Sequence, residues 1–95
     1  MDLNLRDIRA FIAVAQAGSF TRAAVRLHLS QPALTVQVRH LEETIGARLF
    51  DRNSRSVALT PVGRDLLPVL QKSLGDMEQV LHDARALSDG STGTV

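Results

Sequence analysis

Hydrophobic positions recur every three to four residues along four stretches of this chain, and each stretch predicts an amphipathic helix. We expect the first helix over residues 3–17, ended by Gly18, and three more that begin after Ser19, Ser30 and Thr60. Serine and threonine suit the position before a helix because the hydroxyl accepts a hydrogen bond from an unpaired amide of the first turn. Glycine suits the end because it adopts the left-handed backbone conformation without strain.

The third helix has two faces of different character. Its inner face is an apolar stripe made by Leu34, Val38, Leu41 and Ile45. The opposite face carries Pro32, Thr35, Val36 and Arg39, an unusual set for an ordinary surface helix. In a DNA major groove, arginine can pair with guanine, threonine can donate or accept, and valine can contact a thymine methyl group. The pattern therefore favours a recognition helix.

Beyond the third helix the hydrophobic period shortens. Residues 49–52 and 57–60 are short segments around the polar turn 53–56, and this pattern predicts a β-hairpin. Arg52 and Arg55 lie on either side of its tip. Folding alone explains them poorly, whereas arginines at such a tip can enter a minor groove or bind phosphate.

The fourth helix is predicted from Pro61 to about Leu87, and its length of about 40 Å exceeds what so small a body can cover. Pro68 lies inside it and is expected to cause a mild kink. Its apolar residues approximate a 3.5-residue repeat; they are Leu66, Leu70, Leu74, Met77, Leu81 and Ala84. This stripe could pack back on its own domain, but the length of the helix favours a second copy as its partner.

These elements divide the chain into three parts. Residues 1–60 form the body, residues 61–88 form a linker and dimerisation helix, and residues 89–95 form a flexible hinge rich in small polar residues. We expect the hinge to lead to a further domain that is absent here.

Composition limits the class of protein. The chain has 95 residues, 44% of them hydrophobic but only 3% aromatic, so leucine, valine, isoleucine and alanine must build a mainly helical core. There is no cysteine for a disulfide or thiolate zinc site, and the three histidines share no ligand spacing. No apolar run reaches the ~20 residues of a membrane span. We expect a cytoplasmic protein with no metal, no cofactor and no enzymatic site.

Charge is distributed unevenly although the net charge is only +1. Residues 22–64 hold seven arginines against three acidic residues, whereas residues 65–95 hold two cations against five acidic residues. A basic middle and an acidic end are expected if only the middle meets phosphate.

Five motifs carry a resemblance to a known family: GSFTRAA at 18–24, SQPALT at 30–35, QVRHLE at 37–42, LFDR at 49–52 and LTPVG at 59–63. In this order and spacing they resemble the DNA-binding domain of a LysR-type transcriptional regulator, from about Leu5 to Leu87. The resemblance implies a mainly α fold: a winged helix-turn-helix, with three helices and a two-stranded β-hairpin wing, followed by a long linker helix.

The resemblance also implies partners. Family members form homodimers through antiparallel linker helices, which suits an inverted-repeat operator in double-stranded DNA. The full-length protein is commonly a tetramer, and a small-molecule inducer binds only to the effector domain, which is absent here. By family position the DNA-binding residues are Arg22, Ser30, Gln31, Pro32, Thr35, Arg39, Arg52 and Arg55. Two residues depart from the usual basic ones, Val36 and His40, so their contacts with DNA stay open.

Each candidate has a plainer alternative. Arg39 could be a solvated charge paired with Glu42 or Glu43, and Val36 could be a tolerated surface residue. Arg52 could pair with Asp51 or a helix end. For the whole domain, the alternative is a winged-helix protein-interaction module without DNA binding, which would more often show a large apolar patch or acidic rim on the third helix.

Overall fold

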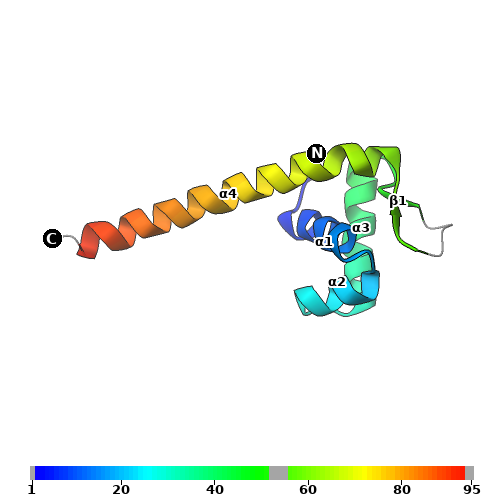
Figure 1. Cartoon of the computed structure of the whole chain (residues 1–95), viewed down its shortest axis with the longest axis horizontal. Helices are drawn as coiled ribbons and strands as arrows, with labels where there is room; N and C mark the ends of the chain where they lie inside the picture. Colours follow the sequence, from blue (N-terminus) through cyan, green and yellow to red (C-terminus); the bar gives the residue numbers. More distant parts are fainter. Residues whose placement is uncertain (1, 52–55, 94–95) are drawn as a thin grey trace.

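The computed structural model describes residues 2–51 and 56–93. In these ranges the elements follow in the order α1 (Leu5–Ala17), α2 (Phe20–Leu27), α3 (Gln31–Ile45), β1 (Phe50–Asp51), β2 (Ala58–Leu59) and α4 (Pro61–Gly93). The first three helices pack into a body, and α4 extends from it as a rod (Figure 1). The molecule therefore measures 59 Å along its longest axis against 26 and 20 Å across. The mainly helical fold with a two-stranded wing is confirmed.

Side-chain caps set where the helices begin. The predicted caps Ser19, Ser30 and Thr60 each accept a hydrogen bond from the amide three residues later, at 3.1–3.2 Å. The first helix begins at Leu5 and not at residue 3, because Asn4 is its cap and accepts from the amide two residues later at 2.9 Å. The missed start reflects a cap that lies inside the periodic stretch.

The helix ends follow left-handed backbone conformations. Gly18 adopts φ of 64° and ends α1, as predicted, and Gly46 adopts φ of 82° and ends α3. His28 adopts φ of 56° without being a glycine, and it ends α2. Directly after it, the Leu29 amide donates to the Ala24 carbonyl at 2.9 Å, which closes the tight turn into α3.

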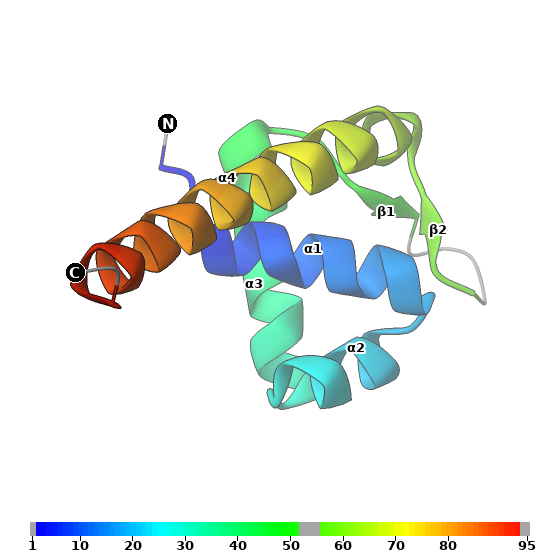
Figure 2. The same ribbon diagram turned by 60° about the vertical axis from the view of Figure 1, so that its left-hand side comes forward.

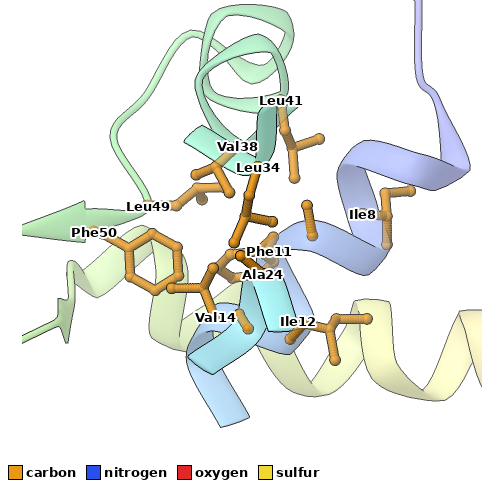
Figure 3. Close-up of a cluster of buried hydrophobic side chains, with 13 residues drawn as sticks. Ile8, Phe11, Ile12, Val14, Ala24, Leu34, Val38, Leu41, Leu49 and Phe50 are labelled. Atoms are coloured by element: carbon orange, nitrogen blue, oxygen red, sulfur yellow. The ribbon is translucent and has the colours of Figure 1, made fainter. Parts of the chain in front are cut away.

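One hydrophobic core joins the body to the wing (Figure 3). The ring centre of Phe50 from β1 lies 5.4 Å from that of Phe11 of α1, in a tilted arrangement, and 5.7 Å from that of Phe20 of α2, in an edge-to-face arrangement. The predicted inner stripe of α3 is buried against them at Leu34, Val38 and Leu41, while Ile45 is half-buried at its edge. Because the core reaches β1, it fixes the wing relative to α3.

A buried carboxylate completes that attachment. Glu42, near the end of α3, accepts hydrogen bonds from the amides of Leu49 at 2.8 Å and Phe50 at 3.4 Å. The strands themselves pair antiparallel, with Phe50 opposite Leu59 and Asp51 opposite Ala58. Within the described residues each strand has two residues, while residue 52 of the first predicted segment lies outside the described ranges.

The long helix α4 continues past its predicted end. It passes through Pro68 and runs to Gly93, so residues 89–93 are helical where we predicted a flexible hinge; residues 94–95 lie outside the described ranges. Extending an existing helix adds one backbone hydrogen bond per residue, and a glycine costs only about 1 kcal/mol. The small polar residues were therefore a weak stop signal.

The body covers only the first part of the α4 stripe. Leu66, Leu70 and Leu74 are half-buried on the core of their own domain, because α4 crosses over α1 directly after the wing (Figure 2). The predicted place of these three leucines in a dimer interface stays a prediction. Farther along, Met77 and Leu81 are 45% and 66% exposed. No helix within the described ranges is long and apolar enough to cross a bilayer.

Candidate nucleic-acid interface

The outer face of α3 is open, as the sequence predicted. Pro32, Val36 and Arg39 are exposed opposite the buried stripe, and Thr35 is half-exposed beside them. Val36 is 65% exposed, although burying it would remove apolar surface from water. Arg39 makes no ion pair within the described residues, so the predicted alternative of a pair with Glu42 or Glu43 is not formed. A long cation and an apolar group therefore point away from the body together.

Thr35 has less freedom than its residue type allows. Its hydroxyl donates to the Gln31 carbonyl one turn earlier at 2.9 Å. The proton is engaged, so the oxygen can accept a hydrogen bond from a ligand while the internal bond is kept. The sequence had left Thr35 free to donate or accept.

The start of α3 forms a second polar group with α2. Gln31 Oε1 accepts from the Thr21 hydroxyl of α2 at 3.2 Å, which leaves the amide nitrogen of Gln31 to donate. The Ser30 oxygen accepts from the backbone of α3 and keeps its own proton. Arg22 is exposed on α2, the helix that packs beside this end of α3. These groups can donate to phosphate oxygens, helped by the positive end of α3.

Beside Arg39, a hollow of about 450 Å³ separates α3 from the segment that leads to the wing. It is lined by Arg39, Glu42, Glu43, Gly46, Ala47 and Arg48. Arg48 is exposed at its rim and adds a cation that the sequence analysis did not single out. The predicted contacts of Arg52 and Arg55 fall outside the described residues and stay predictions.

Sequence reasoning also missed a polar contact between α3 and α1. His40 Nδ1 meets the carboxylate of Asp7, a buried residue in the first turn of α1 that lies 33 positions earlier in the chain. The hydrogen bond to Asp7 raises the pKa of His40 above its ordinary value of 6.5, and the negative charges of Asp7, Asp2 and Glu43 raise it further. Periodicity cannot reveal this pair because it identifies the faces of helices and not which faces meet.

The sequence matches the bacterial regulatory helix-turn-helix protein, lysR family, over residues 5–64. It is 47% identical over 94 residues to a RuBisCO operon transcriptional regulator from Allochromatium vinosum, covering 96% of this chain and 31% of that protein. The chain thus spans about a third of the length of that relative.

Solved structures agree with that match. The BenM DNA-binding domain in complex with catB site 1 DNA has a TM-score of 0.88 and 36% identity, with 93% of this chain and 99% of that one covered. DarR from Vibrio fischeri, solved in complex with DNA, has a TM-score of 0.88 and 29% identity, with 94% of this chain and 30% of that one covered. These likenesses favour DNA over a protein partner as the ligand of the winged helix.

Proposed function

This chain belongs to the LysR family of bacterial helix-turn-helix regulators and carries its DNA-binding domain, and from that premise we propose that two copies together read an inverted-repeat operator. Its role is regulatory and not enzymatic. The observation that carries the proposal is the exposed face of α3, on which Arg39 has no partner within the described residues.

In the proposed complex α3 lies in the major groove. Arg39 donates two hydrogen bonds to a guanine, Val36 contacts a thymine methyl group, and Thr35 accepts from an exocyclic amino group. Pro32, in the first turn of α3, lies against the DNA where the helix enters the groove. The backbone contacts come from Arg22, Ser30 and Gln31 at one side of α3 and from Arg52 and Arg55 of the wing at the other.

The exposed half of α4 supports a dimer. A hollow of about 310 Å³ between helical turns is lined by Met77, Val80 and Leu81, with Asp76 at its edge, and its surface is almost wholly apolar. Ala84 continues this face one turn on. Two such faces packed antiparallel would bury each other and hold two winged bodies in fixed relation, as an inverted repeat requires.

The full regulator extends the proposal. Because the chain covers only part of its relatives, we assign the binding of a small-molecule inducer and the assembly of a tetramer to an effector domain outside this chain. The cytoplasm, where bacterial DNA lies, is the proposed location. No metal or cofactor is required for binding DNA through these residues.

Base reading by Arg39 gives the direct test. Duplexes selected by the protein from a random pool supply the operator, and a scrambled duplex of equal length supplies the reference. Arg39→Ala should cost about 1–3 kcal/mol on the selected duplex, measured by fluorescence anisotropy, and clearly less on the scrambled one. Arg85→Ala, which removes an exposed arginine of distal α4, is the matched control and should change neither value. Equal losses on both duplexes would reassign Arg39 to a phosphate.

A further inference from the structure

The contact between His40 and Asp7 joins a surface residue to a buried one. Nδ1 of His40 faces the Asp7 carboxylate, whose side chain is 6% exposed, while the His40 side chain is 47% exposed. The two ring nitrogens point in different directions. Holding Nδ1 inward against α1 therefore leaves Nε2 at the exposed part of the ring.

His40 lies at the edge of the proposed groove-facing surface. It follows Val36 by about one turn of α3, displaced by roughly 40° around the helix at 100° per residue. Together with Val36 and Gln37 it borders a hollow between α3 and the start of α1. A helix about 10–12 Å across nearly fills a major groove about 12 Å wide. Residues on the flank of such a helix consequently face the phosphates that border the groove.

The surroundings favour a charged imidazole. The hydrogen bond and the charge of Asp7 raise the pKa of His40 most, and desolvation opposes them with a smaller effect. Asp2 from the N-terminal segment and Glu43 from α3 raise the pKa by still smaller amounts. Arg6 of α1 is a cation that lines the same hollow.

We propose that His40 is a phosphate-binding residue of this domain, in which Asp7 holds Nδ1 so that Nε2 donates a hydrogen bond to the DNA backbone beside α3. The inference rests on the proposed placement of α3 in the major groove. It assigns to Asp7 a positioning role, because Asp7 acts through the imidazole and does not touch DNA.

The number of hydrogen-bond donors on the His40 ring makes its contact with phosphate depend on pH. An ionised carboxylate and a phosphate can only accept hydrogen bonds, so Nδ1 and Nε2 must both carry protons. That condition is met only by the imidazolium. The neutral ring that donates to Asp7 presents a bare nitrogen to the phosphate, and the contact is lost. DNA binding should therefore weaken as pH rises through the pKa of His40.

The test measures affinity by anisotropy from about pH 5.5 to pH 8.5, at salt concentrations from about 50 to 200 mM. For the wild type, each bound copy loses one hydrogen bond at the alkaline end, which should weaken binding about threefold to tenfold per copy. The slope of log K against log salt should fall in magnitude by about 0.9 per copy, and therefore by about 1.8 for the dimer on its operator. Both changes should be equal on selected and scrambled duplexes, because phosphate carries no sequence.

Variants separate this contact from a merely structural one. His40→Lys keeps a permanent cation and should bind at every pH as the wild type binds in acid. His40→Gln keeps an amide that can donate to Asp7 but removes the charge, and should be independent of pH with the shallower slope. His28→Gln and His82→Gln, which remove the other histidines, should keep the wild-type profile. A pH dependence that survives His40→Gln would overturn the proposal.

Proton NMR of the His40 ring supplies a second readout. Its titration midpoint should lie above 6.5 in the free protein, fall in Asp7→Asn, and rise further on binding DNA, since a ligand that prefers the imidazolium raises its pKa. An unchanged midpoint on binding would also overturn the proposal. Failure of the proposed function looks different: the wild type would then show no preference for the selected duplex at any pH.

Discussion

Helices α3 and α4 both carry an apolar stripe at helical spacing, but the body covers only one of them completely. On α3, Leu34 and Val38 are fully buried. On α4, Leu74 is the last residue of the stripe that packs against the core, and Leu81 is 66% exposed. The two helices differ in length, with 15 residues in α3 and 33 in α4. The stripe identifies the apolar face of each helix, whereas the length of the helix decides how much of that face its own domain can cover.

The largest effect is expected from a substitution in the covered stripe of α3. Leu34→Ala would leave a cavity among Phe11, Val14 and neighbouring core side chains and should lower the free energy of unfolding by about 2–5 kcal/mol in urea titrations. Leu81→Ala is the matched change in the open stripe. At a protein concentration where the wild type is monomeric, it should cost less than about 0.5 kcal/mol, as exposed positions usually do. Similar losses for both would show that the monomer covers Leu81 as well.

The next effect concerns what covers the open stripe. Leu81→Asp would place a carboxylate in the proposed seam, and burying an unpaired charge disfavours the dimer. We expect a folded monomer that binds the selected operator about a hundredfold more weakly, because each half-site then binds alone. Leu74→Asp is a poorer test, because Leu74 packs on the core of its own domain and the change would also destabilise the body.

Analytical ultracentrifugation at tens of micromolar measures this second effect, with circular dichroism confirming that Leu81→Asp keeps its helices. Gln79→Asp provides a control that adds the same charge to an exposed polar position of α4. Because it also removes the hydrogen bond from Gln79 to Asp83, circular dichroism must show that this variant keeps its helices too. A monomeric wild type, or a dimeric Leu81→Asp, would remove the seam from the dimer interface.

Two glycines of α4 mark the change from covered to open within one helix. A Cβ on Gly63 would lie 2.3 Å from the Leu49 carbonyl oxygen, so Gly63→Ala forces α4 and the wing apart and should destabilise by about 1–3 kcal/mol. A Cβ on Gly75 meets nothing within 4 Å, and Gly75→Ala should stabilise the helix by about 0.4–1 kcal/mol. Thermal unfolding of the two variants measures whether each substitution raises or lowers stability. Two changes of the same sign would place the boundary of the body elsewhere.

The sequence predicted what depends on neighbours along the chain. The caps at Ser19, Ser30 and Thr60 and the left-handed glycines follow from local backbone bonding, and the buried face of α3 follows from its period. The motifs identified the family because they specify these elements in order. The recognition face was predicted as the complement of the buried one.

Contacts between distant segments could not be predicted in the same way. The cover over Leu66, Leu70 and Leu74 depends on the path of α4 across α1, which no local pattern encodes. The same holds for the Glu42 carboxylate under the wing. Sequence treated Glu42 as a possible surface partner of Arg39, because the fold that buries it was not yet known.

The smallest expected effect concerns two polar contacts of α1, one with α3 and one with α4. The Asp7 carboxylate contacts His40 of α3. Arg9 Nη2 lies 3.3 Å from Glu78 Oε2 of α4, and the side chains of Arg9 and Glu78 are each about half exposed. Only the first should respond to pH near neutrality. Asp7 raises the pKa of His40 in the folded state above its ordinary 6.5, to which unfolding returns it. The folded state therefore holds the proton more tightly, and the stabilisation is complete below about pH 6.5 and lost as pH rises through the folded-state pKa.

Melting temperatures across that range, recorded without DNA, should consequently fall for the wild type and stay level for His40→Gln over the same interval. Arg9→Ala should lower stability by at most about 1 kcal/mol at every pH, as exposed ion pairs do, and leave the slope with pH unchanged. A slope removed by Arg9→Ala, or one that survives His40→Gln, would mean that the contact of α1 with α3 is not the titrating one. If only His40→Gln removes the pH dependence of the melting temperature, the two contacts differ in kind. The contact of α1 with α3 then depends on protonation of His40, whereas its contact with α4 joins two groups whose charges do not change over this pH range.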